Sequence, residues 1–247
     1  MSKLVWGFFL LAISFGSHAS AQTTVGEPVV PETSSALDRW SFGLEGGWDE
    51  NTPVITMPDY ASDMKYLKSS GYSFGLSAKY RILNWLYGRA EVLWLQKNYN
   101  MNRTALGNSG SLLNASYVNN YLSVPVTAMV SFGYNFRVFA YAGGYVGYWM
   151  SGSRSGNTFS MNYLLYGDLS STEYDEPWEF DENRDNRFDA GLVYGLGVSL
   201  LVAKHFDISV EGRYYYGLTD VQKDYMSFRT PHYNTTLSIQ AGVAYKF

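Results

Sequence analysis

The chain has 247 residues, of which 17% are aromatic and only 16% are charged, and its formal net charge is -4. Soluble domains carry about 25% charged residues, so this composition is poor in charge and rich in rings for a surface that faces water. The charge balance argues against nucleic-acid binding, which needs a basic surface, and the lack of cysteine excludes disulfides and thiolate metal sites.

The N-terminal 21 residues predict a secretory signal peptide. Lys3 supplies the positive charge, residues 5–15 form the apolar core, and small residues end at Ala21, after which we expect cleavage. Residues 22–38 are rich in Thr, Ser, Pro and Glu, which is typical of a flexible tether, here on the periplasmic side. Beyond the signal peptide no run approaches the ~18 apolar residues of a transmembrane helix. Residues 39–247 are therefore expected to form a single exported domain.

From residue 39 onward, apolar and polar residues alternate in eight segments. A period of two is typical of a β-strand with one apolar and one polar face. The eight segments are residues 40–48, 72–81, 86–95, 121–132, 136–149, 190–200, 206–216 and 235–247. The fifth is rich in Gly and Tyr on both faces, so its facing cannot be assigned. An even number of strands is what a single-chain bacterial β-barrel requires.

The connections between these segments alternate in length. Those at residues 83–84, 133–135 and 203–205 are tight, whereas the others are on the order of 15 to 40 residues, the pattern of short periplasmic turns and long outer loops in outer-membrane barrels. We therefore predict an all-β fold, an eight-stranded antiparallel up-and-down transmembrane β-barrel with periplasmic termini. A ten-stranded barrel with an extra hairpin in residues 157–165 stays open, as does the oligomeric state.

The final segment is typical of a closing barrel strand. Its apolar residues alternate up to Phe247, which suits a strand that pairs with the first one and faces lipid. Its spacing resembles the C-terminal signal by which the outer-membrane assembly machinery recognises its clients. The residues that carry this signal are Gln240, Gly242, Tyr245 and Phe247. Outer-membrane lipid and the barrel-assembly machinery are therefore expected partners, and nucleic acid is not.

Three motifs resemble strands of a known family: residues 121–126 (YLSVPV), 187–197 (RFDAGLVYGLG) and 211–218 (EGRYYYGL). In type and order they resemble the fourth, sixth and seventh strands of the small outer-membrane β-barrel family common in Bacteroidetes, often labelled porin family or PorT-like. The resemblance implies a fold and a location in a Gram-negative cell envelope, but no shared activity. It also suggests that Pro125 is tolerated inside its strand, where we expect a β-bulge.

Charged residues on the polar faces of the strands are expected to point into the barrel. These residues are Glu45, Lys79, Arg81, Arg89, Glu91, Glu211 and Arg213. Eight strands enclose just enough room for side chains, and buried charges need partners, so we expect a packed polar network. The alternative is a gate whose charges exchange partners to open a narrow ion path. Glu91 with Arg89, and Glu211 with Arg213, are the pairs to test.

The connection after the fifth segment is acidic and aromatic. Its candidate anchors for an extracellular glycan or protein are Tyr163, Tyr166, Tyr174, Trp178 and Phe180. Asp181, Asn183 and Asp185 have the spacing of the first three ligands of a calcium loop. Asn186 replaces the usual glycine, however, and Leu192 stands where the glutamate belongs. A solvated loop is therefore preferred, and no metal or cofactor is expected.

Catalysis is a further alternative, because some small barrels modify lipid A or cleave proteins. Hydrolysis would need a histidine near a serine or an acid at one membrane face. His232 with Ser227 and Asp224 is one such set, whereas His205 lies in a tight turn. No H-E-x-x-H or G-x-S-x-G motif occurs. We predict a structural or surface-binding protein without catalysis; the alternatives are a narrow channel for ions or small solutes, then a lipid-modifying enzyme.

Overall fold

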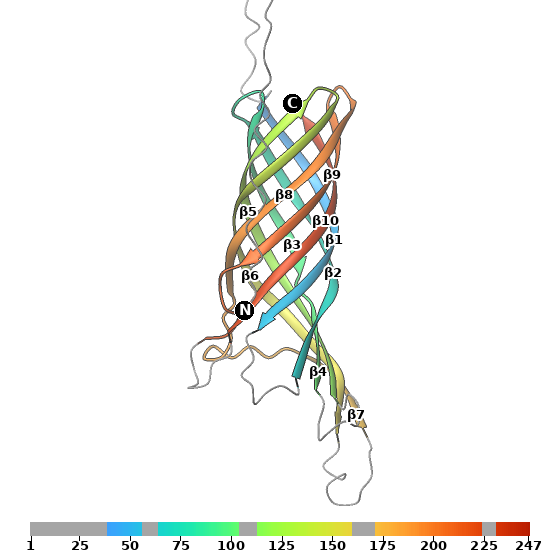
Figure 1. The fold of residues 1–247 in the computed structure, drawn as a ribbon, viewed down its shortest axis with the longest axis vertical. Coiled ribbons are helices and arrows are strands. Elements are labelled where there is room, and N and C mark those ends of the chain that lie inside the picture. The colour runs from blue at the N-terminus through green and yellow to red at the C-terminus, as the bar shows by residue number, and fades with distance from the viewer. Residues whose placement is uncertain (1–38, 56–63, 104–112, 160–170, 224–230) are drawn as a thin grey trace, which may run out of the picture. The chain divides into compact units, whose positions relative to one another are not determined.

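The structure is a computed structural model that describes residues 39–55, 64–103, 113–159, 171–223 and 231–247. The predicted signal peptide and tether lie outside these residues. Within them, ten strands form one antiparallel sheet (Figure 1). They are β1 (Trp40–Ile55), β2 (Met64–Arg81), β3 (Leu86–Gln96), β4 (Tyr99–Arg103), β5 (Leu113–Gly133), β6 (Phe136–Phe159), β7 (Ser171–Pro177), β8 (Phe188–Ala203), β9 (Phe206–Gly217) and β10 (His232–Lys246). No helix in the described part of the chain has the length and apolar character needed to cross a membrane.

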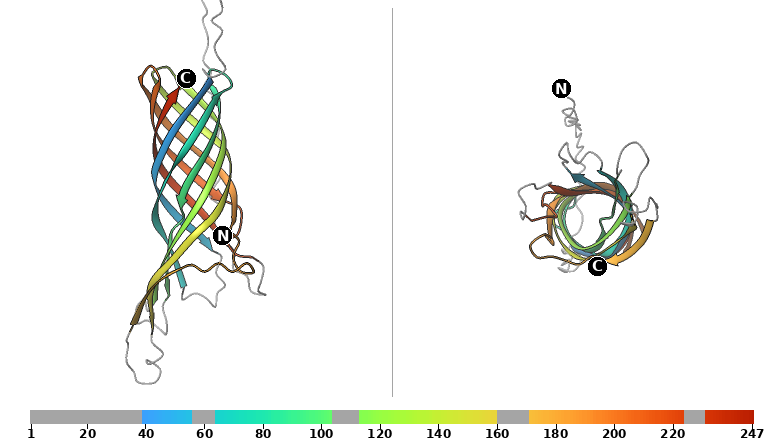
Figure 2. Two further views of the ribbon diagram at one scale, coloured as in Figure 1. Left: turned by 180° about the vertical axis from the view of Figure 1, so that it is seen from behind. Right: turned by 90° about the horizontal axis from the view of Figure 1, so that it is seen from below.

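The strands occupy eight positions in a closed ring, which is seen end-on in Figure 2. β3 and β4 share one position, because both pair with β2 on one side and with β5 on the other. β7 and β8 share another, since both pair with β6. Pairing of β1 with β10, with Leu44 opposite Val243, closes the ring. The predicted eight-stranded antiparallel up-and-down transmembrane β-barrel is thereby confirmed.

Alternating side chains give each strand an apolar outer face. In β10, Leu237, Ile239 and Val243 are exposed by 46–53%, whereas Ser238 and Gln240 on the opposite face are buried. Similar exposed apolar residues on the other strands continue this face around the ring and form an apolar belt. An exposed apolar surface of this extent is unfavourable in water and is what a bilayer-spanning barrel presents to lipid.

The structure resolves the facing of β6, the strand whose pattern is ambiguous in the sequence. Its inner face carries Phe139, Tyr141 and Tyr145, which are all buried. Val138 and Val146 lie on the lipid side and are about half exposed. The tyrosines of β6 therefore fill the barrel interior, where their hydroxyl groups can meet the charged side chains of other strands.

Pro125 lies inside β5, where it lacks the amide hydrogen of a normally paired strand residue. On the β6 side the ladder is continuous through Pro125, and its register shift lies at Asn120 and Tyr121 instead. On the β3 side it is interrupted opposite Pro125, between the pairs Ala90–Val126 and Leu93–Ser123. The register is the same on both sides of this gap, so the expected β-bulge at Pro125 is wrong. The strand instead omits ladder pairing where the proline cannot donate.

The two ends of the barrel differ in their connections (Figure 1). At one end, which we name the turn end, short turns join β2 to β3, β5 to β6 and β8 to β9. The β5–β6 turn requires glycine, because Gly133 has φ +117° and a Cβ there would lie 2.1 Å from the carbonyl oxygen of Phe136. We name the opposite end, from which the other connections leave, the loop end.

At the loop end, part of the sheet continues past the apolar belt as a curved extension, visible at the lower side of Figure 1 and again in Figure 2. We call this extension the tongue. It consists of residues 64–68, 99–103, 113–117, 153–159 and 171–177. The β6–β7 hairpin of the tongue includes part of the region considered for two extra barrel strands. That hairpin lengthens the sheet and leaves the ring at eight positions.

Candidate functional site

Two arginines lie at the centre of a buried charge cluster in the barrel interior. Arg89 of β3 donates from Nη1 to Glu211 Oε2 at 2.8 Å and from Nη2 to Glu45 Oε2 at 2.5 Å. Arg213 of β9 donates to both carboxylate oxygens of Glu91, at 2.6 and 2.9 Å. The five side chains are at most 5% exposed. This cluster satisfies the requirement that buried charges be paired.

Two tyrosines extend the cluster. Arg213 Nε donates to the Tyr141 hydroxyl at 2.9 Å, and that hydroxyl in turn donates to Glu211 Oε1 at 2.9 Å. Arg213 Nη1 also donates to the Tyr215 hydroxyl at 2.9 Å. Sequence reasoning missed Tyr141, because the Gly- and Tyr-rich pattern of β6 left its facing unassigned. Sequence reasoning also missed Tyr215, although Tyr215 lies two residues after Arg213 in β9 and therefore on the same face.

The structure describes all seven charged residues that the sequence assigns to the barrel interior. Only five of them belong to the cluster. Lys79 lies close enough to interact electrostatically with Glu45 and Glu211. Arg81 lies further along β2, where it lines a hollow at the turn end. The interior polar residues are therefore spread along the barrel axis, with the densest packing at the level of Arg89 and Arg213.

A second buried ion pair lies nearer the loop end. Lys97, in the break between β3 and β4, places Nζ 2.5 Å from Asp189 Oδ2 and 3.3 Å from the Tyr145 hydroxyl. The ammonium also lies 4.7 Å from the centre of the Tyr145 ring and 5.3 Å from that of Tyr121. Sequence reasoning missed this pair, since Lys97 follows the alternating segment and Asp189 precedes one. The barrel interior therefore holds two layers of buried ion pairs.

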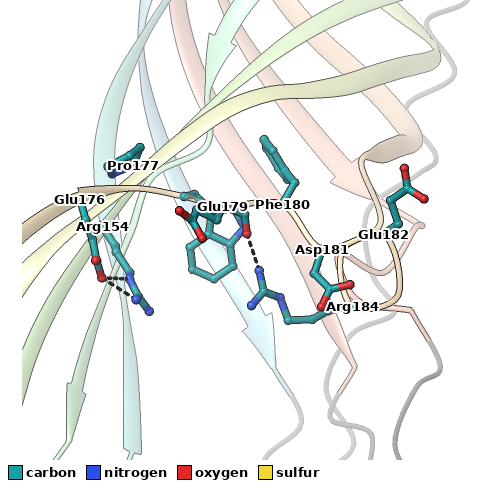
Figure 3. A pocket seen from close by; sticks show the side chains of 9 residues that line it. Arg154, Glu176, Pro177, Glu179, Phe180, Asp181, Glu182 and Arg184 are labelled. Atoms are coloured by element: carbon teal, nitrogen blue, oxygen red, sulfur yellow. Dashed lines mark hydrogen bonds and ion pairs between the residues drawn. The ribbon is translucent and has the colours of Figure 1, made fainter.

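At the loop end, an open hollow of about 610 Å³ lies beside the tongue (Figure 3). Trp178 is one of its lining residues, with the Arg184 guanidinium 4.7 Å from the ring centre and that of Arg154 at 5.9 Å. Arg154 is held by Glu176, with Nε 2.6 Å from Oε1, and Arg184 donates to the Glu179 carbonyl oxygen at 2.8 Å. An aromatic ring thus lies within 6 Å of two guanidinium groups, each of which has a polar partner.

The predicted anchor residues divide into three groups. Tyr163 and Tyr166 lie outside the described residues. Trp178 and Phe180 line the hollow, and Trp149 supports both, by stacking on Trp178 at 5.9 Å and by an edge contact with Phe180 at 4.9 Å. Tyr174 of β7 lies under the Arg154 guanidinium, 5.9 Å from the centre of its ring.

Trp178 also belongs to an aromatic cluster that crosses the tongue. Tyr117 meets Trp178 edge-on at 5.9 Å and stacks on Tyr99 at 4.6 Å. Tyr99 contacts Tyr66 at 6.0 Å and the His232 ring at 5.3 Å. Rings from β2, β4, β5 and β10 therefore lie side by side at the mouth of the barrel. They give the hollow a rigid apolar support.

The spacing that suggests a calcium loop has a different use in the structure. The Asp185 carboxylate accepts hydrogen bonds from Arg184, from the Asp181 amide and from the Trp178 indole at 2.8–3.2 Å. Burial acts to raise the pKa of Asp185, but these donors hold it below its ordinary value. The Asn183 amide donates to Asp181 Oδ1 at 2.8 Å. Among the described residues, no three acidic or histidine side chains form a group that could hold a metal.

The histidine considered for catalysis is buried at the outer end of β10, beyond the apolar belt. Burial lowers the pKa of His232 to about 4, despite the nearby Asp220 carboxylate. Its Nε2 has no hydrogen-bond partner among the described residues. Its suggested partners Ser227 and Asp224 lie outside the described residues. His205 lies at the turn end, with Nδ1 2.9 Å from the Lys246 carbonyl oxygen.

The residues of the predicted C-terminal assembly signal divide between the two faces of β10. Gln240 is buried inside and donates to the Ser73 hydroxyl at 3.0 Å. Gly242 faces the same way, with its missing Cβ position 3.2 Å from the Glu45 side chain. Tyr245 and Phe247 face outward and are 39% and 47% exposed.

A sequence model described as an outer membrane protein beta-barrel domain matches residues 20–223. The structure is similar to that of OprG from Pseudomonas aeruginosa, with 13% identity, 84% of this chain and 95% of that chain covered, and a TM-score of 0.44. It is also similar to Neisserial surface protein A, with 16% identity, coverage of 83% and 97%, and a TM-score of 0.38. The attachment invasion locus protein Ail of Yersinia pestis is similar too, with 12% identity, 84% of this chain and 98% of that chain covered, and a TM-score of 0.38. No curated protein matches the sequence.

Proposed function

Because the chain belongs to the outer membrane protein beta-barrel domain family, and is accordingly a protein of the outer membrane, we propose that it is a closed barrel that binds an external partner through its loop end. In this arrangement the turn end and both termini face the periplasm, as short turns do in outer-membrane barrels. Its role is structural or surface-binding, without catalysis.

The closed interior is supported by the burial of the central charges. The side chains of Arg89 and Arg213 are only 1% and 0% exposed, and each has carboxylate partners on more than one strand. Separating such a pair leaves an uncompensated buried charge, which costs several kcal/mol. An ion path would require this separation at each opening, so the packed network argues against the narrow channel.

The observation that carries the binding role is the hollow around Trp178. It combines a supported tryptophan ring with two guanidinium groups, and Trp and Arg are residue types that dominate binding energy at protein surfaces. Several exposed carboxylates lie beside them. A ring face can stack against a sugar or an aromatic side chain, while the charged groups supply directional hydrogen bonds. The partner is therefore an extracellular glycan or protein.

Biogenesis follows from the same topology. Export by the predicted signal peptide, with cleavage after Ala21, delivers the chain to the periplasm. The barrel-assembly machinery then recognises β10 through Gln240, Gly242, Tyr245 and Phe247. The narrower resemblance to the Bacteroidetes porin-family or PorT-like barrels fits this route in a Gram-negative cell, with outer-membrane lipid around the apolar belt.

The proposal is tested with the refolded protein in lipid nanodiscs. Wild-type protein is applied to a glycan array and to a panel of secreted proteins, and the best binder is measured again with Trp178→Ala. We expect Trp178→Ala to abolish binding and Trp85→Ala, a matched control at the turn end, to leave it unchanged. A ligand that binds Trp178→Ala as well as wild type, or the lack of any ligand, would contradict the proposed binding surface.

A further inference from the structure

The turn end contains a second hollow, of about 310 Å³, whose lining is strongly cationic. Its charged lining residues are Arg39, Arg81, Arg137, Lys204 and Lys246. None of the lining residues that the structure describes is Asp or Glu. The hollow is thus unlike the interior cluster, where each arginine is paired with glutamates.

The Asp207 carboxylate lies close to this hollow and is shared by two of its cations. Asp207 Oδ2 lies 2.5 Å from Arg137 Nη2 and 3.2 Å from Lys246 Nζ. Lys246 is in turn repelled by Arg137 and by Lys79. Arg137 Nε is buried and has no hydrogen-bond partner among the described residues. Arg137 and Lys246 therefore share a single carboxylate, and Arg137 keeps an unused donor.

The hollow is also reached from the lipid side of the barrel. Its lining includes Trp40 and Phe247, which are 37% and 47% exposed on the apolar belt. Arg39 and Lys204 are exposed at the same rim. Indole rings and basic side chains at a membrane boundary occupy the level of the lipid headgroups. A headgroup in the adjacent leaflet can therefore place its anionic part among these cations.

We propose that the turn-end hollow is a binding site for a phosphate group. Guanidinium groups present paired donors that match phosphate oxygens, and lysine adds further positive charge. The phosphate would lie between Arg39, Arg137 and Lys204 and would neutralise charge that Asp207 leaves unbalanced. The group is carried by a phospholipid headgroup or by free phosphate, and the chemistry is the same in both cases. The site does not depend on the loop-end binding role.

The experiment compares two sources of phosphate with the refolded full-length barrel in detergent micelles. Native mass spectrometry measures retention of dioleoylphosphatidylglycerol against dioleoylglycerol, which has the same chains and no phosphate. Isothermal titration calorimetry measures inorganic phosphate. Both are repeated with the double variant Arg39→Gln/Lys204→Gln, which alters two exposed rim residues, and with Arg137→Gln. Heat-modifiable gel migration verifies that each variant is folded.

We expect the phosphate-bearing ligand to bind and the double variant to weaken its binding about thirtyfold, since each basic residue at an anionic membrane surface adds about a factor of five. The matched control Lys65→Gln/Lys68→Gln removes two positive charges at the loop end and should change nothing. Retention of phosphatidylglycerol alone identifies a headgroup site, and binding of inorganic phosphate alone identifies a free-anion site. Absence of both, or equal loss in the loop-end control, would overturn the proposal.

Discussion

Arg89 and Glu211 form an ion pair across the barrel interior, with Nη1 2.8 Å from Oε2, although 122 residues separate them in the sequence. Arg213 and Glu91 form the reciprocal pair across the same strands, at 2.6 Å. β3 and β9 are not neighbours in the sheet. The crossed pairs therefore connect opposite walls of the barrel, in a way that backbone hydrogen bonds cannot.

Removal of one arginine from the cluster should strongly destabilise the barrel. We expect Arg213→Met to lower the free energy of unfolding by about 3 to 5 kcal/mol, because Glu91 and Glu211 would lose a buried partner. Urea unfolding of the refolded protein in lipid vesicles measures this change. Arg154→Met breaks an ion pair whose partners are 45% and 46% exposed, and it should cost less than about 1 kcal/mol. Equal effects of the two substitutions would contradict the role of burial.

The closed interior predicts an electrically silent protein. In planar lipid bilayers the wild-type barrel should show no discrete current steps, because the ionic layers at Arg89 and at Lys97 leave the interior filled with paired side chains. The double variant Glu91→Ala/Arg213→Ala removes much of that volume and should admit water and ions. Wild-type openings that disappear on Glu91→Ala would establish instead that the cluster conducts.

His232 predicts that stability falls in mild acid. Its pKa is lowered to about 4 in the folded chain, below the unfolded value of about 6.5, so the unfolded state binds the proton more readily. The stabilisation is present above pH 6.5 and is lost as the pH falls toward 4, by about 2 to 3 kcal/mol at pH 4.5. Unfolding at pH 7 and pH 4.5 is compared between wild type and His232→Gln, and only the difference between them is assigned to His232. A pH response that His232→Gln leaves intact would refute this assignment.

Substitution of Phe247 is expected to impair assembly into the outer membrane more than it impairs the stability of the folded barrel. The Phe247 ring contacts only the rings of Tyr245 and Phe42 among the described aromatic residues, at 5.0 and 5.9 Å, and remains 47% exposed. Phe247→Ser should therefore lower the unfolding free energy of the refolded barrel by only about 1 to 3 kcal/mol, the value of two aromatic pairs. If Phe247 carries the assembly signal, the amount of folded protein in outer membranes should fall severalfold. Unchanged levels in the membrane would show that the signal lies elsewhere.

Alternation in the sequence predicts the number of ring positions and the inner faces of most strands, because the lipid side of a barrel strand demands apolar residues. It cannot predict which charges meet. Facing places Arg89 and Arg213 inside, but their partners depend on the stagger and tilt of strands far apart in the chain. The simplest expectation, pairing between residues two apart on one strand, holds for Arg213 with Glu211, at 2.5 Å, and for Arg89 with Glu91. It misses the crossed pairs.

The alternation pattern does not predict the tongue, for a different reason. Beyond the belt no lipid demands apolar residues, so strand residues such as Asn114 and Ser116 resemble a loop although they pair in β5. The sequence predicts only some of the residues at the loop-end hollow. Tyr174, Trp178 and Phe180 are recognisable as aromatic anchors by composition. Arg154, which holds Glu176 across β6 and β7, lies in a Gly- and Ser-rich stretch that carries no such indication.

The length of β6 has a consequence for where a partner is met. A bilayer-crossing strand needs about 9 to 11 residues, whereas β6 runs from Phe136 to Phe159, 24 residues in all. Its lipid side stays apolar up to Met150, which is 47% exposed, so residues 151–159 carry the sheet about 30 Å along the strand direction past the apolar belt, at about 3.3 Å per residue. Trp178, whose amide donates to the Gly152 carbonyl oxygen at 2.8 Å, lies at the base of this extension. A ligand that stacks on its ring is therefore met close to the headgroups, while the rest of the tongue projects beyond it.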